Sequence, residues 1–257
     1  MKLLYWLNEW LSLSCQQQQS QLPHYGHALL DTVFVKYELV DIDKPLVFIF
    51  SPSGSDVQQQ DLHPDFEPWG YHFAQQQQVN VIAFQHLGKS NWFRSPSLIA
   101  FLEQLSPLLT PFKCRLGYGL SRGGFAVGAF SDLLMLDHVL LFSPVSTKNK
   151  HLVPWDDRPS TELAQQFDWS GDYHDRNLGS ALGYVIYDPT NDIDRWHAER
   201  FSQLTHIQVE GMGHGVDPSN LNKLGFYNHL AAQFIQHQTL DVDELRQQAK
   251  VRFLQED

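Results

Sequence analysis

The stretch "GYGLSRGGFA", residues 117–126, decides how the rest of the sequence is interpreted. It continues an apolar run typical of a buried strand and leads into "FAVGAFSDLLM", which has helix-like spacing. Gly119 to Gly123 match the pattern G-x-S-x-G, in which glycines two places before and after a serine let strand and helix approach without Cβ clashes. We therefore predict that Ser121 is a nucleophile on a sharp strand–turn–helix connection.

Short apolar runs rich in Val, Ile and Phe recur along the chain, separated by stretches with helical spacing. Most are continuously hydrophobic, as in parallel strands buried on both faces, whereas residues 32–40 alternate like an antiparallel edge strand. The sequence therefore predicts an α/β fold: a three-layer sandwich with a mostly parallel, doubly wound sheet and helices on both faces. The predicted strands are 32–40, 45–51, 79–85, 114–120, 137–143, 182–188 and 205–211, and the predicted helices are 65–77, 97–109, 123–134, 195–204 and 219–237.

The length and composition indicate one globular domain over residues 1–257, with an N-terminal helical segment at 1–28. We interpret the opening residues as an amphipathic helix rather than an export signal, because Asn8 and Glu9 interrupt the apolar run. No apolar stretch is long enough to span a membrane, and two cysteines form no disulfide framework, so a cytoplasmic location is expected. Residues 144–181 are too long for an ordinary connection, which predicts a lid-like insertion.

The formal charge of −11 creates a repulsive field toward phosphate polymers and acidic membrane surfaces, so we expect no nucleic-acid partner. No phosphate-binding or dinucleotide motif and no metal-ligand spacing is present, so neither cofactor nor metal is predicted. Within the insertion, Trp155, Trp169 and Tyr173 are expected to pin the segment to the body of the domain; the alternative is that these rings stack on the face of a sugar. The sequence gives no indication of the oligomeric state.

Around Ser121 the chain resembles the α/β-hydrolase superfamily, which includes esterases, lipases, thioesterases and peptidases. The resemblance implies that an acid and then a histidine follow the serine, each after a later strand. The run "LGYVIYD" ends in Asp188, and the last predicted strand leads to His214 in "MGHGV". We therefore predict the catalytic triad Ser121, Asp188 and His214, with Asp192 as the reserve acid. Asp194 is interpreted as a first-turn residue of the next helix.

A serine hydroxyl attacks a carbonyl only when an imidazole takes its proton, and the third residue orients that imidazole. Acyl transfer also needs donors for the developing oxyanion. The resemblance implies that one donor is the backbone N–H of Arg122 and that the other lies in "FSPSGSD", residues 50–56. This loop lacks the HGGG signature of many lipases; Ser53 is the candidate donor, and an ordinary tight turn is the alternative.

These residues together predict a cofactor-independent serine hydrolase that cleaves a carboxylic ester or related acyl bond of a small molecule through an acyl-enzyme on Ser121. An acyltransferase that uses the same triad is one alternative. The other is a non-catalytic binding or assembly module, because a fold does not guarantee a function. Acyl length and substrate identity do not follow from the sequence.

Overall fold

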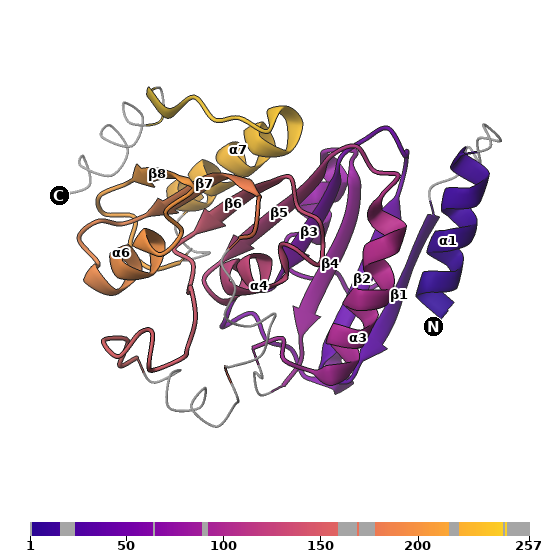
Figure 1. The fold of residues 1–257 in the computed structure, drawn as a ribbon, viewed down its shortest axis with the longest axis horizontal. Coiled ribbons are helices and arrows are strands. Elements are labelled where there is room, and N and C mark those ends of the chain that lie inside the picture. Colours follow the sequence, from indigo (N-terminus) through magenta and orange to yellow (C-terminus); the bar gives the residue numbers. More distant parts are fainter. Residues whose placement is uncertain are drawn as a thin grey trace.

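The computed structural model describes residues 2–15, 24–63, 65–88, 92–158, 169, 178–215, 221–243 and 245. At its centre lies an eight-stranded sheet with the order β1-β2-β4-β3-β5-β6-β7-β8 (Figure 1). The strands from β3 to β8 are parallel, and β1 and β2 are antiparallel to their neighbours, so the predicted fold class is confirmed. The strands are β1 (His24–Leu30), β2 (Val33–Leu39), β3 (Leu46–Phe50), β4 (Asn80–His86), β5 (Arg115–Leu120), β6 (His138–Phe142), β7 (Leu182–Tyr187) and β8 (Thr205–Gln208).

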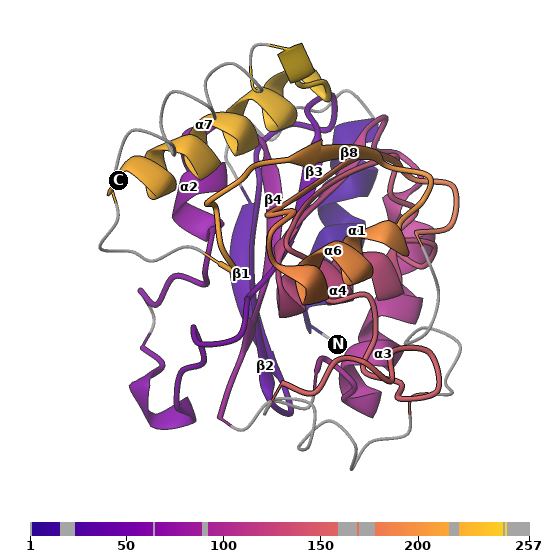
Figure 2. The same ribbon diagram turned by 90° about the vertical axis from the view of Figure 1, so that its left-hand side faces the viewer.

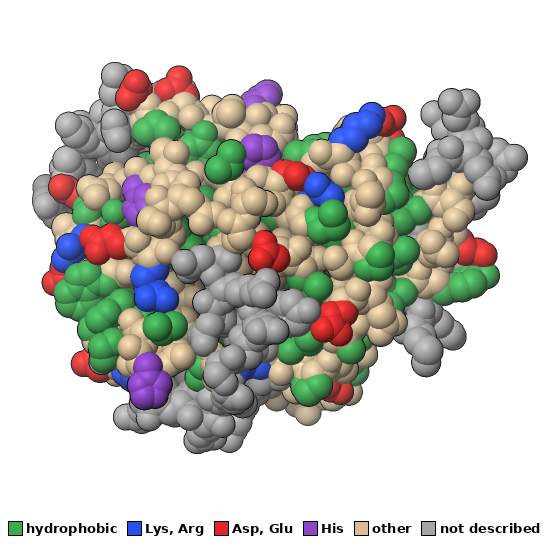
Figure 3. Space-filling model, in the orientation of Figure 1, with side chains coloured by type: hydrophobic (Ala, Val, Ile, Leu, Met, Phe, Trp, Pro, Cys, Tyr) green, Lys and Arg blue, Asp and Glu red, His purple; other side chains and the backbone are tan. Residues whose placement is uncertain are grey.

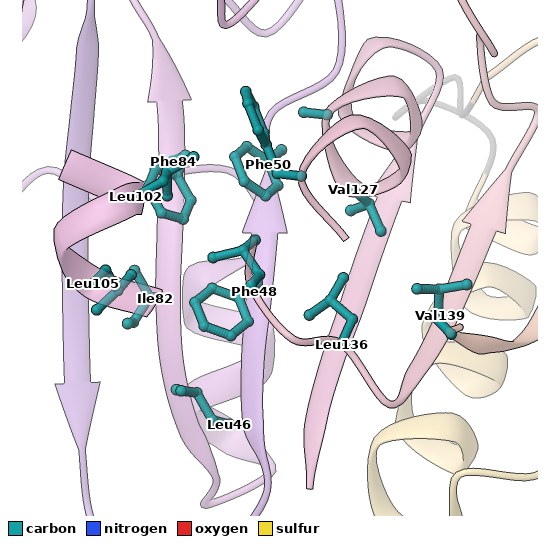
Figure 4. Close-up of a cluster of buried hydrophobic side chains, with 14 of the residues drawn as sticks. Leu46, Phe48, Phe50, Ile82, Phe84, Leu102, Leu105, Val127, Leu136 and Val139 are labelled. Carbon is teal, nitrogen blue, oxygen red and sulfur yellow. The ribbon is translucent and has the colours of Figure 1, made fainter. Parts of the chain in front are cut away.

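Helices cover both faces of this sheet, as Figure 2 shows in a view along its plane. On one face lie α2 (Tyr71–Gln76) and α7 (Leu221–His237); on the other lie α1 (Lys2–Cys15), α3 (Pro96–Leu105), α4 (Arg122–Phe130) and α6 (Asp192–Glu199). Each face has its own cluster of buried apolar side chains. Figure 4 shows where side chains of β3, β4, α3 and α4 gather in the larger cluster. Burial of apolar surface on both faces holds the three layers together.

The order of the strands reverses around β3. The chain passes from β3 to β4 on one side and then crosses to β5 on the other side of β3. Because crossovers between parallel strands are right-handed, this reversal places α2 and α3 on opposite faces of the sheet. A crevice opens at the carboxyl ends of the strands where the order reverses, and ligands of doubly wound folds bind in such crevices. The loops after β3 and β5 therefore frame the expected site.

The N-terminal edge of the sheet differs from the prediction. Residues 32–40 do contain an antiparallel strand, but the edge position predicted for it is wrong, because β1 pairs along the whole of β2. Residues 24–28 belong to β1 and not to the N-terminal helical segment predicted for residues 1–28, since α1 ends at Cys15. Strand β1 reads "HYGHALL", with two histidines and a glycine and no fully buried residue, so it lacks the apolar signal that identified the other strands.

The alternation in β2 predicts one face exposed to solvent, but the segment that leads into α2 and α2 itself cover that face. The Lys36 ammonium donates to the Phe66 carbonyl at 3.0 Å, and the Glu38 carboxylate accepts from Gln75 at 2.5 Å. The polar residues of β2 therefore bind a neighbouring segment of the same chain. An alternating sequence pattern does not distinguish such contacts from exposure to solvent.

The described parts of the predicted insertion, 144–158, 169 and 178–181, pack against the body of the domain. The ring of Trp169 is buried beside Trp92 and Phe125, with ring centroids 6.0 and 5.5 Å away. Trp155 contacts Trp196 of α6 with the ring centroids 5.2 Å apart. The two tryptophans pin the segment as predicted; residues 159–168 and 170–177 lie outside the described residues, and a lid function stays a prediction.

No helix within the described part of the chain is long and apolar enough to cross a bilayer. On the face drawn in Figure 3, acidic and basic side chains are dispersed among neutral ones. The net charge of −11 therefore does not form a single acidic patch on that face.

Candidate active site

Ser121 lies at the sharp turn between β5 and α4. Its backbone angles are φ 52° and ψ −114°, a conformation that costs a non-glycine residue about 1–3 kcal/mol. The turn is held by hydrogen bonds from Ser121 N to the Phe142 carbonyl at 2.9 Å and from Phe125 N to the Ser121 carbonyl at 3.1 Å. The surrounding structure thus imposes the strain, and Ser121 stands at the carboxyl end of β5.

The two flanking glycines make this turn possible through close backbone contacts. A Cβ atom at Gly119 would lie 2.5 Å from the carbonyl carbon of Gly123. A Cβ atom at Gly123 would lie only 2.2 Å from the carbonyl oxygen of Phe50 in β3. Helix α4 therefore starts in van der Waals contact with the backbones of both β3 and β5, and no side chain fits at these two positions.

The structure brings Ser121 and His214 together, although 93 residues separate them in sequence. Ser121 Oγ is 3.0 Å from His214 Nε2, and His214 Nδ1 is 2.7 and 2.9 Å from the two carboxylate oxygens of Asp194. Because a carboxylate only accepts hydrogen bonds, Nδ1 carries the proton and Nε2 is free to accept the serine proton. The loop that carries His214 turns at Gly213 and Gly215, which have φ values of 67° and 90°.

The acid that contacts His214 is Asp194, so the predicted contact with Asp188 is wrong. The Asp188 carboxylate instead accepts hydrogen bonds from Thr190 N at 2.9 Å, Thr190 Oγ1 at 2.7 Å and Gly213 N at 2.8 Å. Thr190 in the local turn occupies Oδ1 of Asp188, and Gly213 N in the loop after β8 occupies Oδ2. The reserve candidate, Asp192, is mostly exposed and pairs with Arg195.

Asp194 lies in the first turn of α6, as predicted, and its side chain reaches the site from there. Asn191 caps this helix by accepting a hydrogen bond from Asp194 N at 3.2 Å, which fixes Asp194 as the third helical residue. Its side chain is 1% exposed, while that of His214 is 34% exposed. The positive end of the helix dipole stabilises the buried carboxylate. The pattern N-x-x-D predicts only a helix N-cap, so sequence analysis missed the contact between Asp194 and His214.

Arg122 contributes to the site through its backbone N–H and, separately, through its guanidinium group. Its backbone N–H is the first of α4, and the first N–H groups of a helix have no partner within the helix. Its guanidinium is fully buried and donates from Nη2 to the Pro52 carbonyl at 2.8 Å and to Asp56 Oδ1 at 2.6 Å. Burial lowers the pKa of Arg122, and the contact with Asp56 opposes that shift. The side chain thereby anchors the loop after β3 beside the serine.

That loop also carries Ser53, which is exposed and lines the pocket at Ser121. Pro52 has no N–H, so the amide of Ser53 is the first donor of the pocket-lining loop, and its role stays a prediction. The loop is further held by the buried Gln85, which donates to the Ser55 carbonyl at 2.7 Å and accepts from Trp69 N at 3.1 Å. Gln85 therefore connects two segments that line the pocket.

The pocket encloses about 680 Å³ at the edge of the sheet where the strand order reverses. Apart from His214, its lining side chains are uncharged, and five of them are large and apolar or aromatic. Trp69 stacks on Tyr118 with ring centroids 5.4 Å apart. The lining residues are Pro52, Ser53, Gly54, Ser55, Trp69, Gly70, Phe73, Tyr118, Leu120, Ser121, His214, Gly215, Tyr227 and Asn228. Among the described residues, no group of three or more His, Cys, Asp or Glu is arranged to hold a metal ion.

Solved structures share this architecture. The chain is similar to the crystal structure of EstE5-PMSF (TM-score 0.52, 11% identity, 96% of this chain and 91% of that one). It is similar to the capsule O-acetyltransferase of Neisseria meningitidis serogroup A (TM-score 0.54, 11% identity, 82% and 94%). Carboxyl esterase 2 from the mycorrhizal fungus Tuber melanosporum gives a TM-score of 0.52 at 11% identity, over 84% and 87%.

The chain has the α/β-hydrolase fold. At 11% identity these likenesses show the fold and not the activity. No protein-family model matches the chain, and no curated protein matches its sequence.

In this α/β-hydrolase fold, a second buried polar cluster lies behind Asp194, and sequence analysis missed it. Asp156 Oδ2 accepts from Lys148 Nζ at 2.5 Å and from His197 Nε2 at 3.0 Å, and Asp156 Oδ1 accepts from Arg158 Nε at 2.9 Å. Arg158 Nη1 also donates to Asp194 Oδ1 at 3.3 Å. The only sequence signal is the concentration of charges in "KNKHLVPWDDR", and such runs are usually solvated.

Burial and the mutual contacts set the charge states of this cluster. Burial alone would raise the pKa of Asp156, but hydrogen bonds from His197, Arg158 and Lys148 hold it well below its usual range. Burial lowers the pKa of Lys148 to about 8 and that of His197 to about 4, although Asp156 opposes both shifts. Since Ser146 N donates to His197 Nδ1 at 3.1 Å, the neutral ring carries its proton on Nε2 and donates it to Asp156.

The close contact at Gly123 predicts a large loss of stability for Gly123→Ala. The new Cβ collides with the Phe50 carbonyl of β3, a backbone atom that cannot rotate away, so we expect the free energy of unfolding to fall by about 3 kcal/mol or more. Gly225→Ala is the matched control, because a Cβ there meets nothing within 4 Å in an exposed part of α7; it should stabilise the chain by about 0.5–1 kcal/mol. Urea unfolding measures both; equal effects of the two changes would contradict the proposed contact.

The neutral, buried state of His197 predicts a loss of stability at acidic pH. Between about pH 6.5 and pH 4 the unfolded chain binds a proton at this histidine that the folded chain does not, so the free energy of unfolding falls by about 2–3 kcal/mol as the pH is lowered through this range. His197→Gln keeps an N–H for Asp156 but cannot titrate, and this part of the loss should vanish. Replacement of the exposed His72 by Gln is the control. If urea unfolding gave the same loss of free energy of unfolding over this pH range for the wild type and for His197→Gln, the assignment would be refuted.

Proposed function

We propose that the chain is a cofactor-independent serine hydrolase that cleaves a carboxylic ester or related acyl bond through an acyl-enzyme on Ser121. The observation that supports it is the unbroken row of contacts from Ser121 Oγ through the two ring nitrogens of His214 to the buried Asp194. In this row each group has the proton state that its neighbour requires for nucleophilic catalysis.

The reaction begins when Ser121 Oγ attacks the acyl carbon and His214 Nε2 takes the hydroxyl proton. The carbonyl oxygen becomes an oxyanion, for which the backbone N–H groups of Arg122 and Ser53 are the candidate donors. Collapse of the tetrahedral intermediate breaks the bond to the leaving alcohol, which receives the proton from His214. Water then attacks the acyl group with His214 again as the base, and the acid is released with regeneration of the Ser121 hydroxyl.

Asp194 is the third catalytic residue in this proposal, in place of Asp188. Its carboxylate faces Nδ1 and stabilises the imidazolium that forms while Ser121 attacks. Asp188 keeps a supporting role, since its hydrogen bond to Gly213 N holds the backbone next to His214. The two carboxylates therefore act on one loop, the first on its backbone and the second on its imidazole.

The pocket favours an uncharged substrate of moderate size. Its volume of about 680 Å³ exceeds the space that a short acyl group fills, and its aromatic walls bind apolar surface. The described residues that line the pocket include no Lys or Arg, so they offer no counter-ion to a free carboxylate or phosphate on the substrate. Neutral esters, including aryl esters and acylated sugars, fit this environment.

The same acyl-enzyme can pass its acyl group to water or to an alcohol, and the contacts of Ser121, His214 and Asp194 serve both reactions. The proteins with similar folds include an esterase and an O-acetyltransferase, so the shared fold does not distinguish the two activities. The ratio of free acid to transferred ester, measured with an added alcohol, distinguishes hydrolase from acyltransferase. The intact row of contacts favours either enzyme over a non-catalytic binding module.

A fluorophosphonate probe should label the wild-type protein at Ser121. Ser121→Ala should abolish the labelling and lower kcat for a neutral p-nitrophenyl ester by at least about 10³-fold, because the nucleophile is lost. Ser106→Ala, which changes a serine of the 3-10 helix at Ser106–Leu109 and not a pocket residue, should be labelled like the wild type. Peptide mapping by mass spectrometry locates the adduct. A folded wild-type protein that is never modified at Ser121 would overturn the proposal.

The choice of acid is tested by comparing Asp194→Asn with Asp188→Asn. We expect Asp194→Asn to reduce kcat by about 10³–10⁴-fold, because an amide cannot stabilise the imidazolium and favours the wrong tautomer. Asp188→Asn should reduce kcat less than about tenfold and lower the free energy of unfolding by about 1–3 kcal/mol, because the amide NH₂ cannot accept and leaves the N–H of Thr190 or of Gly213 without its acceptor. Steady-state kinetics and urea unfolding check both variants. A larger kinetic effect at Asp188 would restore the acid predicted from the sequence.

A further inference from the structure

Arg158 joins the candidate triad to the buried cluster behind it. Its guanidinium donates to both oxygens of Asp156, from Nε at 2.9 Å and from Nη2 at 3.1 Å, and from Nη1 to Asp194 Oδ1 at 3.3 Å. The Asp194 oxygen that it contacts is the one that lies 2.7 Å from His214 Nδ1. The arginine side chain is 22% exposed, while the carboxylates of Asp156 and Asp194 are 0% and 1% exposed.

We propose that Arg158 is a positioning residue of the triad, which holds the Asp194 carboxylate against His214 and keeps His214 in its base form to more acidic pH. The inference rests on the proposed function, because it assigns a role within the same row of contacts. It gives the segment 144–158 a task beyond packing: the segment supplies the cation that faces the catalytic acid.

The position of the guanidinium is fixed from the side opposite Asp194. Planar guanidinium and carboxylate groups pair through two parallel hydrogen bonds, which sets the orientation as well as the distance. Asp156, the anchor of this pair, is itself held by Lys148 and by His197. His197 and Asp194 both belong to α6, three residues apart, so one helix carries Asp194 and a residue that holds the anchor Asp156. Movement of Arg158 relative to Asp194 is therefore restricted.

The charges around His214 explain the effect on its protonation. The groups that face it from the packed elements are Asp194 of α6, Arg158 beside that carboxylate, Asp188 beneath Gly213, and the hydroxyl of Tyr227, which donates to Gly215 O at 3.5 Å. Behind Arg158 lie the paired Lys148 and Asp156 and the neutral His197. Asp194 attracts a proton to the imidazole, and the Arg158 cation opposes this attraction. Without Arg158 the carboxylate would favour the imidazolium more strongly.

The cluster also contains a row of Ser146, His197 and Asp156 that has the residue types of a catalytic triad. Ser146 Oγ lies 2.9 Å from His197 Nδ1, and His197 Nε2 lies 3.0 Å from Asp156. The Ser146 amide already donates to Nδ1 at 3.1 Å, so that nitrogen is not free to accept a hydroxyl proton. Burial lowers the pKa of His197 to about 4, which makes the ring a weak base. This row therefore supports Asp156 and is not a second active site.

The test is the titration of His214 by NMR in the intact protein, followed through its imidazole Hε1 signal and assigned with His214→Asn. In Arg158→Gln, we expect the midpoint to move up by about 0.5–1 pH unit, because a nearby cation is lost. Arg158→Lys, which keeps the charge, should restore at least half of that difference. Arg195→Gln removes a cation of α6, the helix that carries Asp194. Among the described residues Arg195 forms ion pairs with the exposed Asp192 and Glu199, so the midpoint of this variant should match the wild type. The acid limb of kcat/KM for a neutral ester should move in parallel with the NMR midpoint.

A role in packing alone would lower stability without moving the midpoint, and displacement of Asp194 alone would move it down. An Arg158→Gln midpoint that is not at least about 0.2 pH units above that of the wild type therefore overturns the proposal. An equal shift in Arg195→Gln also overturns it. If Arg158→Gln is poorly folded, Arg158→Met, which retains the aliphatic packing, provides the same comparison. The NMR readout needs no substrate; a protein that shows the expected shift but never reacts at Ser121 would reject the proposed hydrolase and leave the assignment of Arg158 standing.

Discussion

The close approach of helix α4 to strands β3 and β5 is the constraint on which the rest of the structure depends. The backbone of Gly123 lies so near Phe50 that a methyl group does not fit, and Gly119 faces the first turn of the helix in the same way. This contact forces Ser121 into its strained conformation and places the first N–H of α4 beside the loop after β3. The candidate nucleophile and a candidate oxyanion donor are thus positioned by one backbone contact, which the packing of the surrounding sheet maintains.

The second requirement is electrostatic. Two carboxylates, Asp156 and Asp194, are buried almost completely, and a buried charge is tolerated only when it is paired and hydrogen-bonded. Asp194 meets this condition with His214, the α6 N-terminus and Arg158, while Asp156 meets it with Lys148, His197 and Arg158. Arg158 is common to both sets, so the residues behind the triad and the triad itself form one network. A substitution in the segment 144–158 is therefore expected to affect the candidate site without altering a residue that lines the pocket.

Most of the fold followed from the sequence because its signals are local. Continuous apolar runs identified β3 to β8, an alternating run identified β2, and the glycines around Ser121 identified the turn. Strand β1 carried no such signal, since none of its residues is fully buried. His214 was predicted from the order of residues that the resemblance implies, but its acid partner was not. Which of several acids in "DPTNDID" turns toward His214 depends on hydrogen bonds between segments distant in sequence, and periodicity holds no information about them.

The arrangement of the two acids shows why position at a strand end was a poor guide. Residues directly after β7 must turn sharply to begin α6, and Asp188 closes that turn by binding Thr190. The same carboxylate binds Gly213 N and so connects the end of β7 to the loop after β8. Its two oxygens are then occupied, and the role of partner to the imidazole passes to Asp194, which the Asn191 cap orients one helical turn later. The acid that organises the loop backbone and the acid that faces His214 must be different residues, because one carboxylate cannot lie in both places.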